Sequence, residues 1–446
     1  MKIVWIAVDT LRADRVGCYQ PKKESLTPHM DSLAEESILF EKMIAENNVT
    51  QSAFVTMMSG RHPYQHGIVN MKPRSIPRKI HPLSLLLRKH GYQTGAIDCN
   101  YRITGPENPW FTRGYQTYID PARDRTTHLT TSADEINEHA LPWLEEHYDK
   151  ENFFLFLHYW DPHYPYRPQS DVPITIEPIR DDHLQLKNVM REPLYSYVKE
   201  WNPETNNPDY ICAQYDQTVS QVDRAIGEVI ATLKRLQIFE DTLLLLVADH
   251  GEGMGDHQIY FNHHSLYDSM IHVPFMLCYP RQFPQHKRIP ALVEQADITP
   301  TILTLANIQP PRHFTPMDGK PLIPLIHERK KEIHPFVISC EANWHLKRSI
   351  RTHKWKLIQA FDKDAYGNPR FELYDLVNDP LENSNLAAKH PQIVKTLHRQ
   401  MTRWVRYMLK KYKREDPLRI GVREHLHPLT ANEEEKVKKR LTELGY

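Results

Sequence analysis

The stretch "TLLLLVADHGEGMGDH" (residues 242–257) joins an apolar run to a dense set of polar residues. An uninterrupted apolar run of this length, followed by turn residues, is typical of a strand buried on both faces of a parallel sheet. Asp249 and His250 come directly after the run, and the glycines behind them permit a tight turn. The stretch therefore predicts a strand whose carboxyl end presents a carboxylate and an imidazole.

Similar short runs recur along the chain, and amphipathic segments lie between them. Further predicted strands are "KIVWIAV" (2–8), "TGAIDC" (94–99), "FFLFLHY" (153–159) and "HVPFMLCY" (272–279). The predicted helices between strands include residues 27–40, 81–92 and 214–236. Alternating strands and helices favour an α/β sandwich with a large, mostly parallel central sheet flanked by helices.

The composition changes near residues 308–335, which are rich in proline and then in charge. Beyond this segment, four short runs resemble strands of a small antiparallel sheet: 336–341, 347–352, 355–361 and 371–376. The tail from about residue 390 has a helical and heavily charged pattern. We therefore expect a main domain over residues 1–330 and a C-terminal subdomain over residues 331–446.

Overall composition argues against several kinds of partner. Lys+Arg and Asp+Glu both number 56, so no basic excess indicates nucleic acid. Neither a signal peptide nor a run of membrane-spanning length is apparent, which predicts no membrane partner. Scattered cysteines without a CxxC pair indicate reduced thiols and a cytoplasmic protein; they are Cys18, Cys99, Cys212, Cys278 and Cys340.

Three acids follow predicted strands directly or within two residues: Asp9, Asp161 and Asp249. Ligands of open α/β sheets bind outside the carboxyl ends of the strands, so these acids are expected to converge on one edge. Asp9, Asp249 and His250 would form an oxygen-rich site with one nitrogen, which suits a divalent cation. The alternative is that each acid only caps the helix or turn that follows it.

Two hydroxyls stand at the start of a predicted helix in "ENNVTQSAFVTMMSGRHPYQHG" (46–67). A helix N-terminus favours anions and polarised hydroxyls, because its first N–H groups lack helical partners. Most such residues are simply caps, and a free alcohol is a poor nucleophile at neutral pH. Thr50 or Ser52 becomes a candidate nucleophile only if the predicted metal site lies beside it.

Histidines in two further stretches are candidate site residues. His163 lies in "HYWDPHYPYRP" (158–168), and His263 and His264 lie in "FNHHSLYDSMIHVPF" (261–275). An imidazole after a strand can hydrogen-bond a charged substrate or protonate a leaving oxygen. A purely structural role is the alternative for each.

The chain resembles the sulfatase family of the alkaline phosphatase superfamily, nearly from end to end. The resemblance is carried by "VDTLRADRVGCYQ" (8–20), residues 27–68 around Thr50, "LLLLVADHGEGMGDH" (243–257) with "LYDSMIHVPFML" (266–277), and "RSIRTHKWKLIQAF" (348–361) with residues 371–387. It implies an alkaline-phosphatase-like sandwich. It also favours Thr50 over Ser52 as the nucleophile.

The resemblance also implies a single divalent metal ion, with Ca²⁺ first and Mn²⁺, Mg²⁺ or Zn²⁺ as alternatives. The metal-site residues it implies are Asp9, Thr10, Thr50, Asp249 and His250. His163 and one of His263 or His264 would contact the anionic ester group. The adjacent pair leaves that assignment open by one residue.

Several positions depart from the family pattern. The family's nucleophile is a cysteine matured to formylglycine within Cys-x-Pro-Ser-Arg, whereas this chain has Thr50-Gln51-Ser52-Ala53-Phe54. Thr10 stands where a second aspartate is common, and residues 96–102 lack the Lys-Trp-His run of many members. Formylglycine therefore cannot arise here by the usual route.

Superfamily relatives that attack phosphorus with a metal-bound Thr or Ser offer a chemical parallel. We expect a metal-dependent hydrolase that cleaves a sulfate or phosphate ester of a small-molecule or glycan-like substrate, with Thr50 as the nucleophile. One alternative is a phosphodiesterase or phosphotransferase that uses the same site. The other is a non-catalytic binding protein with a sulfatase fold.

Overall fold

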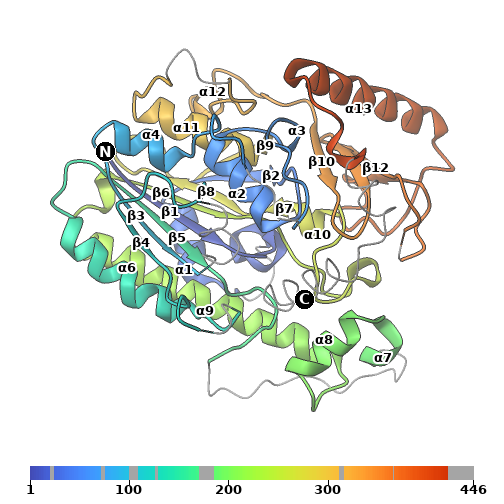
Figure 1. Cartoon of the computed structure of the whole chain (residues 1–446), viewed down its shortest axis with the longest axis horizontal. Coiled ribbons are helices and arrows are strands. Elements are labelled where there is room, and N and C mark those ends of the chain that lie inside the picture. Colours follow the sequence, from blue (N-terminus) through green and yellow to red (C-terminus); the bar gives the residue numbers. More distant parts are fainter. Residues whose placement is uncertain are drawn as a thin grey trace.

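The computed structural model describes residues 1–20, 25–71, 76–99, 109–125, 129–169, 185–310, 316–364 and 366–419. Within these residues the chain forms two separate sheets (Figure 1). The larger has nine strands in the order β4-β3-β5-β1-β6-β8-β2-β7, with β9 paired to β2. The smaller has four strands, β10 to β13, in chain order.

The larger sheet is built around β1 (Lys2–Val8), which lies between β5 (Phe153–Tyr159) and β6 (Thr242–Ala248). All three run parallel, and nearly all of their residues are buried, as their continuous apolar runs predict. The other strands are β2 (Ile38–Ile44), β3 (Gln93–Asp98), β4 (Thr117–Ile119), β7 (His272–Val273), β8 (Phe275–Cys278) and β9 (Lys287–Glu294).

One expected strand differs in the structure. The run 272–279 divides at Pro274 into β7 and β8, because proline offers no N–H to a ladder. β8 runs antiparallel to β6, so the sheet is parallel from β4 to β6 and mixed beyond. The prediction of a large, mostly parallel sheet is confirmed for the half that carries the strand-end acids.

Helices cover both faces of the larger sheet (Figure 1). α6 (Ala133–His147), α9 (Pro208–Arg235) and α1 (Pro28–Glu35) pack together on one side. α2 (Thr50–Ser59), α4 (Leu83–Lys89) and α11 (Ile298–Leu305) lie on the other. The shorter helices are α3 (Pro63–His66), α7 (Leu186–Val189), α8 (Leu194–Trp201), α10 (Asp268–Ile271) and α12 (Ile323–Ile326).

The smaller sheet is antiparallel, as its four short runs predict, and α13 (Pro391–Tyr412) packs against it. Its strands are β10 (Val337–Glu341), β11 (Lys347–Arg351), β12 (Trp355–Ala360) and β13 (Phe371–Asp375). The division near residue 330 stays a prediction, and the end of the predicted tail, 420–446, lies outside the described residues.

Across the described part of the chain, no helix is both long and apolar enough to cross a membrane. All five cysteines are free thiols, and Cys99, Cys278 and Cys340 are buried.

Candidate active site

The carboxyl ends of β1 and β6 bring Asp9, Asp249 and His250 together. His250 Nε2 lies 3.3 Å from Asp249 Oδ2 and 3.9 Å from Asp9 Oδ1. None of the three side chains is accessible to solvent. Because β1 and β6 are parallel neighbours paired up to Val8 and Ala248, the residues that follow them meet at one edge of the sheet.

The backbone around these acids is fixed by close contacts. Thr10 adopts a left-handed conformation with φ 52°, which is uncommon for a β-branched residue. Its N–H donates to Asp249 Oδ1 at 3.1 Å, and its carbonyl accepts from the Tyr215 hydroxyl at 2.9 Å. At Gly251 a Cβ would lie 2.1 Å from the Ser269 carbonyl oxygen, so this turn requires glycine. The site is held rigid from several elements.

Thr50 is the first residue of α2, and its hydroxyl lies against the acidic cluster. The Thr50 Oγ1 atom is 3.2 Å from His250 Nε2 and 3.5 Å from Asp9 Oδ2. The Ser52 hydroxyl instead donates to the Ile68 carbonyl at 2.7 Å, so it neither caps the helix nor reaches the cluster. Of the two candidate hydroxyls, the structure places Thr50 at the site.

Asp161 does not converge with the other strand-end acids, so that expectation was wrong. Its Oδ2 accepts a hydrogen bond of 2.8 Å from the N–H of Ala133, the first residue of α6. Asp161 is the second residue after the end of β5, whereas Asp9 and Asp249 follow their strands directly, and this extra residue places its carboxylate at a helix N-terminus instead. Asp161 therefore caps a helix, but one that precedes it in the chain instead of following it. Asp249 Oδ1 accepts a 2.7 Å hydrogen bond from the N–H of His250 in the turn that follows, yet the Asp249 carboxylate still lies in the cluster with Asp9 and His250.

The three predicted histidines occupy different places. The His263 ring lies 4.2 Å from the His250 ring and 5.9 Å from the His163 ring. His163 stacks on Trp160 at 4.1 Å, and its Nδ1 donates to the Tyr164 carbonyl at 2.6 Å.

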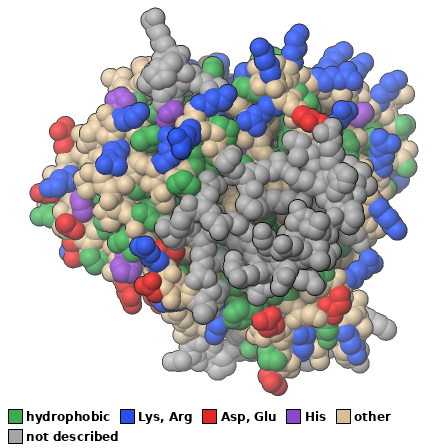
Figure 2. Space-filling model, viewed as in Figure 1, with side chains coloured by type: hydrophobic (Ala, Val, Ile, Leu, Met, Phe, Trp, Pro, Cys, Tyr) green, Lys and Arg blue, Asp and Glu red, His purple; other side chains and the backbone are tan. Residues whose placement is uncertain are grey.

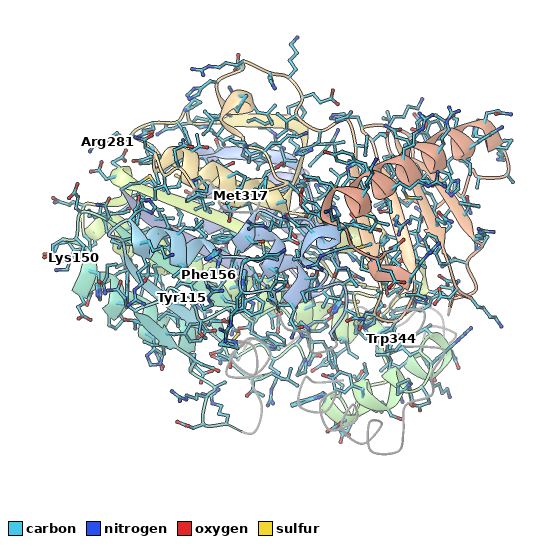
Figure 3. The ribbon with its side chains drawn as sticks, turned by 45° about the horizontal axis from the view of Figure 1, so that its top comes forward. Tyr115, Lys150, Phe156, Arg281, Met317 and Trp344 are labelled. Carbon is cyan, nitrogen blue, oxygen red and sulfur yellow. The ribbon has the colours of Figure 1, made fainter. Side chains whose placement is uncertain are left out.

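His264 turns toward the C-terminal part of the chain, where its ring stacks on Trp344 at 4.8 Å. Figure 3 labels Trp344, which lies between β10 and β11 of the smaller sheet. Its Nδ1 lies 3.4 Å from Asn343 Nδ2. Of the adjacent pair, His263 therefore faces the acidic cluster, whereas His264 contacts the C-terminal part of the chain.

His158 is a site residue that the sequence analysis did not identify. It lies near the end of β5, and the pairing of β5 with β1 places it beside the backbone that leads to Asp9. Its Nδ1 is 2.8 Å from Asp98 Oδ1 at the end of β3, and its Nε2 is 3.4 Å from Asp9 Oδ2. The feature of the sequence that could have identified His158 is that it is the single imidazole within an otherwise apolar and aromatic strand.

Phe54 stands where the family pattern has an arginine. Its ring packs edge-on against His158 at 4.7 Å and against Phe156 at 5.8 Å. Figure 3 labels Phe156 inside the larger sheet. The position therefore contributes an apolar wall behind the site, where a charged guanidinium would otherwise stand.

Burial and neighbouring charges shift the titration of the cluster. Burial and then the Asp9 carboxylate raise the pKa of Asp249 to about 6. Burial also acts to raise the pKa of Asp9, but the His158 contact and the imidazoles of His163 and His250 outweigh it and lower that pKa. The cluster therefore concentrates negative charge where water cannot solvate it.

The donor set fits a divalent cation. Among the described residues, Asp9 Oδ1, Asp249 Oδ2 and Thr10 Oγ1 are buried and have no hydrogen-bond partner. Oxygens buried without a partner are costly, and a cation would satisfy them. His250 Nδ1 donates to the Gly251 carbonyl at 3.0 Å, which leaves Nε2 directed at the cluster as a metal-ligating histidine requires.

The comparison with protein families agrees with the family resemblance seen in the sequence. The model described as Sulfatase matches residues 2–308, which include β1, α2 and β6 with all of the strand-end acids. The chain belongs to the sulfatase family. It is therefore an ester hydrolase of the alkaline phosphatase superfamily. A second model, described as N-sulphoglucosamine sulphohydrolase, C-terminal, matches residues 255–407.

Individual relatives agree with this family assignment. The sulfatase chain is 25% identical to a delta 4,5-hexuronate-2-O-sulfatase of Bacteroides thetaiotaomicron, over 88% of this chain and 85% of that protein. The structure of a 2-O GAG sulfatase superposes with a TM-score of 0.73 at 21% identity, over 93% and 95% of the two chains.

A phosphonate monoester hydrolase of Agrobacterium radiobacter shares the fold, with a TM-score of 0.68 at 19% identity over 91% and 95% of the chains. These likenesses confirm the predicted sandwich with its additional small antiparallel sheet. Family members generally bind a divalent metal ion.

Proposed function

We propose that this sulfatase-family protein hydrolyses a sulfate ester of a sugar with Thr50 as its nucleophile. The observation that carries the proposal is the position of Thr50 Oγ1, 3.2 Å from His250 Nε2 and 3.5 Å from Asp9 Oδ2. The neighbouring Ser52 hydroxyl instead donates a hydrogen bond to the Ile68 carbonyl. The named activity of the hexuronate sulfatase relative supports a sulfated sugar as the substrate.

The residues that would hold a divalent ion are Asp9, Thr10, Thr50, Asp249 and His250, and Ca²⁺ is the ion we propose. A bound dication would supply charge that polarises the ester group and favours an ionised alcohol. The protein's contribution is a set of buried ligands fixed on strand ends. Such preorganised groups need little rearrangement during the reaction.

The reaction that this geometry supports has two halves. In the first, Thr50 Oγ1 bonds to the sulfur, the bond from sulfur to the bridging ester oxygen breaks, and the hydroxyl proton ends on the departing alcohol. In the second, a water oxygen bonds to the same sulfur and the bond from Thr50 Oγ1 to sulfur breaks. One proton of the water returns to Thr50 Oγ1, and the other leaves with the departing sulfate or passes to solvent.

Two imidazoles of the site would relay these protons: His163 and His263, whose rings lie 5.9 Å apart. Burial lowers the pKa of both, so that neutral imidazoles are favoured at rest. A neutral imidazole suits the acceptance of a proton from the attacking water in the second half.

A phosphate or phosphonate ester is the second candidate substrate class. An unmodified alcohol favours it, because Thr50 cannot form the formylglycine hydrate used by cysteine-based members of the family. A phosphotransferase would use the same covalent step and pass the group to an alcohol. The fold shared with a phosphonate monoester hydrolase is compatible with these alternatives.

The deciding assay measures turnover of an aryl sulfate, an aryl phosphate and an aryl phosphodiester, each with Ca²⁺, Mg²⁺, Mn²⁺ or Zn²⁺. Sulfate-ester turnover that requires both an ion and Thr50 supports the proposal. Ion-dependent turnover of the phosphorus esters alone selects the second candidate, and product found on an added alcohol selects transfer.

We also propose a reducing, cytoplasmic location for the protein. Its five free cysteines support this proposal.

A further inference from the structure

The outer face of α13 carries a continuous stripe of positive charge. Neither Asp nor Glu occurs anywhere between residues 391 and 414. The basic stripe consists of five exposed residues spaced four, four, three and four apart: Lys395, Arg399, Arg403, Arg406 and Lys410. At 100° per residue this spacing confines them to an arc of about 80°, along roughly 22 Å of the helix.

The opposite face of α13 is its packing face. The buried residues of the helix are Leu397, Met401, Val405 and Met408, which lie about half a turn away from the basic stripe. Trp404 packs against His62 at 4.7 Å, and Lys411 forms a 2.9 Å ion pair with Asp318. The helix is therefore anchored by residues outside the stripe, which leaves the stripe facing solvent.

Internal ion pairing does not account for the stripe. Within the described residues, none of its five cations forms a salt bridge. Like charges three or four residues apart destabilise a helix, so the spacing also has no benefit for helix stability. On the acidic helix α6, by contrast, Asp134 and Glu145 pair with Arg224 and Arg235 of α9.

The net charge of the chain is zero, so the local excess of positive charge on α13 is not apparent from the overall composition. Figure 2 shows blue side chains gathered over the place that α13 occupies in Figure 1. A linear array of unpaired cations attracts an extended polyanion, releases its counterions and raises its local concentration. The complementary partner is therefore a linear polymer with regularly spaced negative charges.

We propose that the basic stripe of α13 binds the chain of a sulfated polysaccharide whose ester groups are hydrolysed at the Thr50 site. The choice of this polyanion rests on the proposed function, since a sulfated sugar is the substrate proposed above. α13 packs on α3, which follows the nucleophile helix α2 after a short turn. The same polymer would thus contact the stripe outside the catalytic pocket.

The test compares two variants that each lose three positive charges. The stripe variant is R399Q/R403Q/R406Q. The matched control is K79Q/R88Q/K89Q, whose three side chains are exposed on and before α4. Binding of heparin, as a sulfated polysaccharide, is measured calorimetrically at several salt concentrations, and thermal unfolding checks that each variant is folded.

We expect the stripe variant to bind heparin at least about tenfold more weakly at low salt, with a shallower salt dependence, and the control to bind nearly as the unmodified protein does. KM for a sulfated polysaccharide should rise in the stripe variant without a change in kcat, while turnover of a small sulfate ester stays unchanged. If the triple variant unfolds, K395Q/K410Q at the two ends of the stripe provides the same comparison.

Unchanged heparin binding in the stripe variant, or equal loss in the control, overturns the proposal. So does tighter binding of single-stranded RNA, or of vesicles containing phosphatidylserine, than of heparin at the same salt. Absence of turnover with every small ester would contradict the proposed function instead. Heparin binding is measured without catalysis, so the two failures are distinguishable.

Discussion

The His158 imidazole approaches the Asp9 carboxylate to 3.4 Å between Nε2 and Oδ2. Its other nitrogen is held 2.8 Å from Asp98 Oδ1, and Tyr118 donates its hydroxyl to Asp98 Oδ2. The pairing of β3 with β5 and of β5 with β1 sets this order. Asp9 is thus oriented by a chain of polar contacts in which His158 and Asp98 are buried.

Removing His158 should weaken the binding of a divalent ion. We expect His158→Ala and Asp98→Asn to raise the dissociation constant for the activating ion by about 10- to 100-fold, because Asp9 loses its orienting partner. His158→Gln, which keeps a donor, should recover part of the affinity. Calorimetric titration of each purified variant with the ion measures the effect.

The control for this prediction is His90→Ala, an exposed histidine at the end of α4. It should bind the ion as the unmodified protein does. Unaltered ion affinity in His158→Ala would show that Asp9 needs no support from β5.

A divalent ion should stabilise the protein against unfolding. Binding to the folded state alone adds about 2.7 kcal/mol when the ion is present at 100 times its dissociation constant. Asp9→Asn and Asp249→Asn should lose most of this gain, because each removes one of the buried carboxylates. Thermal unfolding with and without the ion, after treatment with a chelator, measures it.

Asp161→Asn is the matched control, since its carboxylate caps α6 and lies outside the cluster. It should keep the ion-dependent rise in melting temperature even if its basal stability falls. An ion response in Asp249→Asn equal to that of the unmodified protein would mean that the ion binds elsewhere.

A buried ion pair between the 3-10 helix Gln295–Asp297 and the segment before β10 should make stability depend on pH. His334 Nε2 lies 2.9 Å from Asp297 Oδ2. Burial lowers the pKa of His334, but the carboxylates of Asp297 and Glu294 outweigh it and raise that pKa from 6.5 to about 9. The contribution is therefore fully present below pH 6.5 and is lost as pH rises through about 9.

The comparison that isolates this contribution is His334→Asn against the unmodified protein, by urea denaturation between pH 6 and pH 10. The difference in unfolding free energy should be on the order of 3 kcal/mol at the acidic end and shrink toward zero at the alkaline end. A difference that stays constant across this range would exclude the ion pair as its source.

The strands around the site can be predicted from the sequence because each is encoded by a continuous apolar run of neighbouring residues. β1, β5 and β6 are unbroken apolar runs, and the acids that follow two of them meet because parallel neighbours end at one edge. Thr50 at the start of α2 was likewise visible from the hydroxyls before an apolar segment. The small antiparallel sheet followed from four short β-rich runs.

The remaining features depend on contacts between distant parts of the chain. The sequence near His158 does not reveal that its imidazole would contact Asp98. That residue lies two strands away from Asp9 in the sheet. Asp161 resembles Asp9 locally, and only the arrival of the α6 N-terminus decides that it caps a helix. The turn of His264 toward Trp344 likewise depends on where the smaller sheet docks.

The most direct test of the central claim is mass spectrometry of the protein quenched during turnover of an aryl sulfate or aryl phosphate. We expect one added sulfo or phospho group on the peptide that contains Thr50, located on that residue by fragmentation. It also predicts that Thr50→Ala loses about 10³-fold or more in kcat, while Ser52→Ala, whose hydroxyl faces a carbonyl, stays active. Turnover that persists in Thr50→Ala, or a covalent group found on another residue, would contradict it.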